Sequence, residues 1–128
     1  MVKIIMHGCN GRMGRVITEL VREEENVEIV AGVDPYATEE QEYPIVASIE
    51  QCQVKADVVV DFSNAAAVDG LLEYCGKENV PVVLCTTGLS EEQLHKVEET
   101  AKKTAVLRSA NMSLGINLLM KLLQDAAK

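Results

Sequence analysis

The chain has 128 residues, which suits a single domain with one hydrophobic core, and its 48% hydrophobic and 25% charged residues are typical of globular proteins. Its formal net charge of −8 repels polyanions, so nucleic acids and acidic membrane surfaces are not expected partners. No apolar run approaches the ~18 residues of a membrane span, and the first residues do not have the pattern of a signal peptide.

Short apolar runs rich in valine and isoleucine alternate with stretches of helical period along the chain, which is typical of repeated strand–helix–strand units. The expected strands span residues 2–7, 27–34, 57–62, 80–86 and 104–109. Their centres carry almost no polar residues, so both faces of each strand should be covered by helices. The predicted fold class is therefore α/β, with a doubly wound and mainly parallel sheet.

Apolar spacing predicts a first helix that begins near Gly11. Its apolar stripe follows i, i+3, i+4 spacing and consists of Met13, Val16, Ile17, Leu20 and Val21. A second helix is expected after Asn64, which is a good N-cap residue.

The sequence Ser90-Glu-Glu-Gln93 is a capping box and predicts the start of a third helix. Leu94, Val97 and Ala101 should mark the buried face of this helix. Residues 35–44 have no regular period and are expected to form a loop, with a short strand or turn at 45–47.

Apolar residues between Ile116 and Leu123 nearly encircle a helix, so more than one face of it should be buried. The pattern continues to Lys128 without a stop signal. We expect residues 1–128 to form one cofactor-binding domain, in which residues 113–128 are a helix that leads toward a C-terminal domain outside this chain.

A glycine-rich segment, Gly8-Cys-Asn-Gly-Arg-Met-Gly14, lies between the first strand and the first helix. A dinucleotide pyrophosphate requires a backbone that it can approach closely and the N–H groups of a helix N-terminus. Gly8 would allow the tight turn, Gly11 would leave room beside the phosphates, and Gly14 would let the helix pack close to the strand. The spacing G-x-x-G-x-x-G differs from the commoner G-x-G-x-x-G, but its strand–turn–helix context favours a Rossmann-like dinucleotide site.

The second strand ends in Asp34, 20 residues after Gly14, where a carboxylate can accept hydrogen bonds from both hydroxyls of the adenosine ribose. It would also repel a 2′-phosphate, and Pro35 supplies no cation, so NADH is favoured over NADPH. Arg12 could still reach a 2′-phosphate, which leaves NADPH open.

Three later strands also end in polar residues, at 61–64, 85–88 and 109–113. In doubly wound sheets the ligand crevice lies at these carboxyl ends. Thr86, Thr87 and Asn111 offer hydrogen-bonding groups there, and Met112 could pack against the nicotinamide.

Four motifs together, G-C-N-G-R-M-G, D-F-S-N, C-T-T-G-L-S and S-A-N-M-S-L-G-I-N-L-L, resemble the N-terminal domain of 4-hydroxy-tetrahydrodipicolinate reductase, also called dihydrodipicolinate reductase. The resemblance implies NAD(P)H-dependent reduction of a small dicarboxylate in the diaminopimelate and lysine pathway, by a full-length protein expected to be a homo-oligomer. It implies that Thr87 lies near the substrate. The expected cofactor-binding residues are Gly8, Cys9, Asn10, Gly11, Arg12, Met13, Asp34, Phe62, Ser63, Cys85, Thr86, Thr87, Ser109, Ala110, Asn111 and Met112.

Two positions depart from the family pattern, since Cys85 replaces a usual glycine and Met112 a usual phenylalanine. The family's His-His-x-x-Lys segment and Ser-Gly-Thr loop, which supply acid catalysis and bind the substrate carboxylates, lie outside this chain. We therefore expect no catalytic residue in it, and no substrate turnover by it alone.

Two other functions are compatible with the motifs. The chain could be a standalone NADH-binding redox sensor, or part of a Rossmann oxidoreductase with an unrelated catalytic domain. The gene sequence beyond Lys128 would discriminate the reductase from the sensor. A His-His-x-x-Lys segment there favours the reductase, and an effector module favours the sensor.

The four cysteines include no C-x-x-C pair, and the two histidines have no companion at metal-ligand spacing. We expect reduced, mostly buried cysteines, no metal site and a cytoplasmic location. The oligomeric state of the chain by itself is left open.

Overall fold

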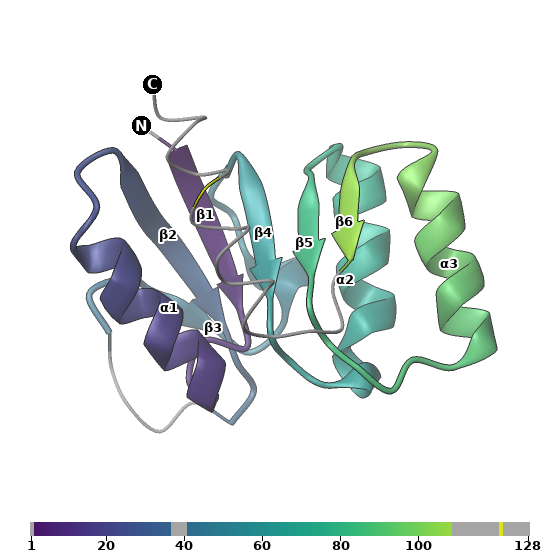
Figure 1. Cartoon of the computed structure of the whole chain (residues 1–128), viewed down its shortest axis with the longest axis horizontal. Helices are drawn as coiled ribbons and strands as arrows, with labels where there is room; N and C mark the ends of the chain where they lie inside the picture. Colours follow the sequence, from purple (N-terminus) through teal and green to yellow (C-terminus); the bar gives the residue numbers. More distant parts are fainter. Residues whose placement is uncertain (1, 37–40, 109–120, 122–128) are drawn as a thin grey trace.

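Figure 1 shows a computed structural model of the chain, which describes residues 2–36, 41–108 and 121. In these residues, parallel strands form one sheet in the order β3-β2-β1-β4-β5-β6. The strands are β1 (Val2–His7), β2 (Val27–Val33), β3 (Ile45–Val46), β4 (Val58–Asp61), β5 (Val82–Leu84) and β6 (Val106–Arg108). The helices are α1 (Arg12–Arg22), α2 (Ala65–Glu78), α3 (Glu91–Ala101) and the short 3₁₀ helix η1 (Ile49–Gln51).

This strand order is that of the doubly wound dinucleotide-binding folds, so the predicted fold class is confirmed. The chain starts at the centre with β1, moves outward through β2 and β3, and then returns to add β4 on the other side of β1. The order therefore reverses between β1 and β4, where His7 pairs with Asp61 in register. Ligands of such folds bind at the carboxyl ends of the strands at this switch point.

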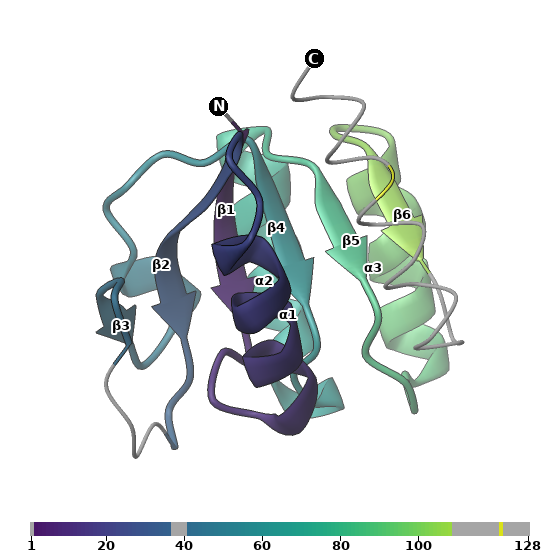
Figure 2. The same cartoon turned by 60° about the vertical axis from the view of Figure 1, so that its left-hand side comes forward.

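Helices cover both faces of the sheet, as Figure 2 shows for α1 on one side and α2 and α3 on the other. Ile17 and Val21 of α1 pack against Ile4 and Met6 of β1 in one core cluster. The opposite cluster joins Ile5 of β1 to the apolar face of α2 and to η1. Because successive side chains of a strand point to opposite faces, β1, β2, β4 and β5 each contribute to both clusters.

The buried face of α1 differs from the expected stripe. Val16 is 41% exposed, and Thr18 is buried instead. Burial of Thr18 leaves its hydroxyl paired, because it donates at 2.8 Å to the carbonyl of Gly14, one turn earlier in α1, and lies 2.9 Å from the hydroxyl of Tyr43, which precedes β3.

The buried face of α3 also differs in one residue. Ala101 is exposed, whereas Thr100 is buried, so the prediction for Ala101 was wrong. The reason is that Thr100 lies on the side of α3 that faces Gly76 of α2. An i, i+3 step from Val97 therefore follows the contact with α2 better than the i, i+4 step assumed from the sequence.

Other local predictions are confirmed. The Gln93 backbone N–H donates to Ser90 Oγ at 3.2 Å, and Ser90 N–H donates to Gln93 Oε1 at 3.0 Å, which completes the capping box. Asn64 is the N-cap of α2, although its side chain makes no capping hydrogen bond. The strands are up to four residues shorter than expected, as for 82–84 against 80–86.

The expected terminal helix at 113–128 lies outside the described residues except for residue 121, so this part of the domain assignment stays a prediction. Among the helices of the described ranges, none combines the length and the apolar character needed to cross a membrane.

Candidate cofactor-binding site

The turn after β1 depends on the absence of a side chain at Gly8. Its φ of +87° is a conformation that residues with a Cβ rarely adopt, and a Cβ there would lie 2.7 Å from the Phe62 carbonyl oxygen. The Gly8 N–H donates to the Val33 carbonyl at 2.7 Å, and its own carbonyl accepts from Gly11 N–H at 3.1 Å. The turn is thus fixed between the ends of β2 and β4.

Gly14 allows α1 to begin directly against this turn. A Cβ on Gly14 would lie 2.3 Å from the Gly8 carbonyl oxygen and 2.7 Å from that of Cys9, so no side chain can be accommodated without moving the helix. At the N-cap, Gly11 is less crowded, because the nearest atom to its Cβ would be the Gly8 carbonyl oxygen at 3.3 Å. The first backbone N–H groups of α1 lack hydrogen-bond partners within the helix. With glycine at positions 11 and 14, these two residues place no side chain over them.

Asp34 follows β2 and connects the turn to the next loop. Its Oδ2 accepts from the Asn10 N–H at 3.0 Å, and its Oδ1 accepts from the Tyr36 N–H at 2.9 Å. Because a carboxylate has about four acceptor positions, each oxygen can still accept a hydrogen bond from a ligand hydroxyl. The two amides fix the carboxylate at the edge of the glycine turn.

A buried polar cluster lies at the switch point between β1 and β4. Asp61 is fully buried, and its Oδ1 lies 2.7 Å from His7 Nδ1 and accepts from Ser63 Oγ at 2.6 Å and Ser63 N at 3.2 Å. Its Oδ2 accepts from Thr86 Oγ1 at 2.5 Å. These hydrogen bonds connect the carboxyl ends of β1, β4 and β5, so that one carboxylate orders three strand ends.

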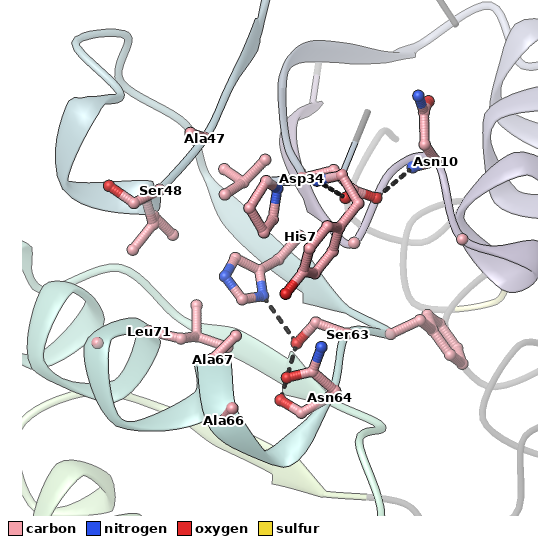
Figure 3. A pocket seen from close by; sticks show the side chains of 18 of the residues that line it. His7, Asn10, Asp34, Ala47, Ser48, Ser63, Asn64, Ala66, Ala67 and Leu71 are labelled. Atoms are coloured by element: carbon pink, nitrogen blue, oxygen red, sulfur yellow. Dashed lines mark hydrogen bonds between the residues drawn. The ribbon is translucent and has the colours of Figure 1, made fainter. Parts of the chain in front are cut away.

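Figure 3 shows the pocket above these strand ends, which has a volume of about 580 Å³. One wall comes from residues 47–50, another from the start of α2, and the glycine turn and Asp34 close a third side. Small or apolar side chains dominate between these walls, and His7 projects among them. The apolar or small lining residues include Ala47, Ile49, Phe62, Ala66, Ala67, Gly70 and Leu71.

The charged side chains of this pocket are acidic. Asp34 and Glu50 line it, and no lysine or arginine is found among the described residues of its lining. Arg12 is exposed at the start of α1 but is not part of the lining. The pocket therefore favours neutral or hydrogen-bond-donating groups near Asp34 over a further phosphate.

Three thiols are buried in the core, and we refer to Cys9, Cys75 and Cys85 as the buried thiols. Burial raises the pKa of Cys9 to about 11, that of Cys75 to about 12 and that of Cys85 to about 11. Because the thiolate is the reactive form, these side chains are poor nucleophiles at neutral pH. Cys9 and Cys85 are buried and lie outside the lining of the pocket described above.

The pocket brings together six of the residues that the sequence singled out. These are Gly8, Asn10, Gly11, Asp34, Phe62 and Ser63. Outside the lining, Met13 packs against the core, Thr86 is buried on Asp61, and Thr87 is exposed after β5. Ser109, Ala110, Asn111 and Met112 lie outside the described residues.

Sequence reasoning missed two parts of this site. It did not give His7 a role in the pocket, and it did not place the segment 47–50 there. The available signal for His7 was a polar residue at the end of an otherwise apolar strand, directly before the glycine turn. The 47–50 wall follows a two-residue strand, which leaves almost no pattern in the sequence.

Comparison with known protein families decides the assignment. Residues 2–112 match the model of the family described as "Dihydrodipicolinate reductase, N-terminus". The chain belongs to the dihydrodipicolinate reductase family. This result confirms the family resemblance carried by the four motifs, and together with the dinucleotide-binding strand order it indicates an NAD(P)H cofactor.

Curated relatives agree over the whole chain. The 4-hydroxy-tetrahydrodipicolinate reductase of Clostridium novyi (strain NT) is 50% identical over 125 residues, which are 98% of this chain and 50% of that protein. The enzyme of the same name from Caldanaerobacter subterraneus subsp. tengcongensis is 47% identical over 128 residues, covering 100% of this chain and 51% of its own. The chain thus spans about half the length of the curated relatives it matches.

Solved structures show the same fold. A dipicolinate-bound dihydrodipicolinate reductase from Paenisporosarcina sp. TG-14 is 28% identical with a TM-score of 0.77, covering 95% of this chain and 52% of that one. The WlbA dehydrogenase from Chromobacterium violaceum, in complex with NADH and UDP-GlcNAcA, is 16% identical with a TM-score of 0.69, covering 84% and 34%. The second likeness concerns the fold alone.

Proposed function

We propose that this chain is the NAD(P)H-binding part of a 4-hydroxy-tetrahydrodipicolinate reductase, and that it binds NADH at least as well as NADPH. The observation that carries the proposal is the joining of Asp34 to the glycine turn through the Asn10 amide, 3.0 Å from the carboxylate. This arrangement places a ribose acceptor and a phosphate-binding helix N-terminus at the edge of one pocket.

The glycine turn fits a pyrophosphate for a steric reason. Any Cβ at Gly8 or Gly14 would meet backbone oxygens, so this region is held as bare backbone against which a phosphate can lie. Gly11, at the helix N-cap, borders the pocket and keeps its entrance free of a side chain. We assign the pyrophosphate to the segment 8–13 and the adenosine ribose to Asp34.

The preference for NADH follows from charge. A 2′-phosphate on the ribose would approach the Asp34 carboxylate, and Glu50 adds a second negative charge to the same pocket. Pro35, next to Asp34, has no N–H that could donate a hydrogen bond to the 2′-phosphate. Arg12 is the cation best placed by sequence to oppose this effect, but it lies outside the pocket lining.

The bound nicotinamide would supply the hydride. We assign its side of the site to residues 85–87 and 109–112, with Thr87 nearest the substrate because it is exposed at the carboxyl end of β5. Reduction of a dicarboxylate also needs a proton donor and cations beside the nicotinamide. We place these groups in the remaining half of the full-length protein, which we expect to be a cytoplasmic homo-oligomer.

Two measurements test this proposal. Calorimetric titration of the 128-residue chain with NADH and NADPH should show binding of both, with NADH no weaker. The chain should not consume NADH when 4-hydroxy-tetrahydrodipicolinate is added, and a full-length relative assayed in parallel should do so. Absence of NADH binding would refute the cofactor assignment. Turnover by the chain at the rate of the full-length relative would refute the assignment of the proton donor and the cations to the other half of the protein.

A further inference from the structure

We propose that His7 recognises the base of the dinucleotide by accepting a hydrogen bond from the 6-amino group of adenine through its Nε2. The inference rests on the proposed dinucleotide binding and adds a determinant of base specificity to it. It concerns a side chain that neither the glycine turn nor Asp34 accounts for.

His7 is held in one orientation. Its side chain is only 5% exposed, and its Nδ1 lies 2.7 Å from Asp61 Oδ1 and 3.1 Å from Ser63 Oγ. Nε2 has no hydrogen-bond partner among residues 2–36 and 41–108. Figure 3 shows the ring with one nitrogen toward Ser63 and the other directed into the open part of the pocket.

The partner on Nδ1 decides what Nε2 can do. A carboxylate only accepts hydrogen bonds, so Nδ1 must carry the proton that it donates to Asp61. In the neutral ring, the second nitrogen is then an acceptor. His7 therefore presents a fixed lone pair to the pocket, and its complement is an N–H donor on the ligand.

The surroundings of His7 fit a flat base with a polar edge. The pocket around it is lined by the small apolar side chains of Ala47, Ala66 and Ala67, which are at least partly exposed and suit the apolar faces of a purine. Asp34 borders the same pocket, so a ribose bound there would direct its base into this space rather than toward β5. Adenine brings a single exocyclic amino donor, whereas hypoxanthine has a carbonyl oxygen in its place.

The test compares NADH with reduced nicotinamide hypoxanthine dinucleotide, in which a carbonyl oxygen replaces the 6-amino group and the neighbouring N1 carries a proton. Dissociation constants are measured in mildly alkaline buffer for the 128-residue chain and for His7→Asn. Asparagine is shorter, so that its amide N–H can still donate to Asp61 while no atom reaches the place of Nε2. His95→Asn is the matched control, because His95 is exposed on α3 and outside the pocket.

The wild type should bind NADH about two- to tenfold more tightly than the hypoxanthine analogue, the range expected for one neutral hydrogen bond. His7→Asn should bind NADH and the analogue with equal affinity, and His95→Asn should retain the wild-type preference for NADH. Equal affinities in the wild type, or a ratio that survives in His7→Asn, would overturn the role of His7 while leaving dinucleotide binding intact. Preference for the hypoxanthine analogue would overturn it as well, since Nε2 would then bind the C6 oxygen or the N1–H group and not a 6-amino group.

A second measurement needs no substitution. The ¹⁵N resonance of His7 Nε2 in the wild-type chain should shift toward the hydrogen-bonded range on addition of NADH and not with the analogue. An identical response to both ligands would contradict the proposal even if His7→Asn failed to fold. If NADH itself caused no change and did not bind in the titration, the cofactor assignment, and not only the role of His7, would be wrong.

Discussion

Replacing Thr86 with valine should lower the free energy of unfolding by about 1.5–3 kcal/mol, the usual contribution of a hydrogen bond to a charged group. Within the described residues, Asp61 Oδ2 has the Thr86 hydroxyl as its only donor, at 2.5 Å, whereas Oδ1 has several. Valine has nearly the shape of threonine, so the substitution removes the donor and leaves an oxygen of a fully buried carboxylate without a partner.

Urea unfolding followed by far-UV circular dichroism measures the effect. With a slope of about 1–3 kcal/mol per M, the midpoint should fall by roughly 1 M. Thr87→Val is the matched control, because Thr87 is exposed and its replacement should change stability by about 0.5 kcal/mol or less. Equal losses in the two variants would show that the Asp61 cluster does not stabilise the three strand ends in the way argued from its geometry.

Three further results are expected. Gly11→Val should abolish NADH binding in calorimetry with little loss of stability, since its Cβ would lie 3.3 Å from the nearest atom; unchanged affinity would exclude the turn as the phosphate site. Asp34→Ser with Pro35→Arg should shift the ratio of NADPH to NADH affinity toward NADPH by about 1–3 kcal/mol, and a parent chain that already prefers NADPH strongly would contradict the charge argument. The buried thiols stay protonated in the folded chain up to their raised pKa values, whereas unfolded thiols ionise near pH 9. The free energy of unfolding should therefore fall as pH rises from 9 to 11, by up to ~1.4 kcal/mol per pH unit for each thiol. Urea midpoints across this interval that do not move would show that these thiols ionise equally in both states.

The sequence predicted the sheet well because its strands are buried on both faces. Such strands are continuous apolar runs, and their centres agree with β1, β2, β4, β5 and β6. Their ends were less accurate, since the polar residues that follow β5 are not part of the strand. The faces of α1 and α3 were wrong by one residue each, at Val16 and Ala101, because helical spacing gives the width of an apolar stripe but not its rotation against a neighbour.

The part of the site made by the glycine turn and Asp34 could be predicted because its geometry is local and its glycines have few other uses. The Asp61 cluster could not be predicted in the same way. His7 and Asp61 are 54 residues apart and meet only through the parallel register of β1 and β4. A sequence displays the residue types of such a pair, but the register that brings them together depends on the packing of the entire sheet.

Gly32 extends the steric requirements of the glycine turn into the neighbouring strand. A Cβ on this β2 residue would lie 2.6 Å from Cys9 Sγ and 2.5 Å from a ring carbon of Tyr43. Any larger residue at 32 would displace Cys9, and with it the backbone against which α1 begins. A mutational scan that selects for cofactor binding should therefore recover glycine at position 32 as strictly as at Gly8 and Gly14, although it lies outside the pocket lining.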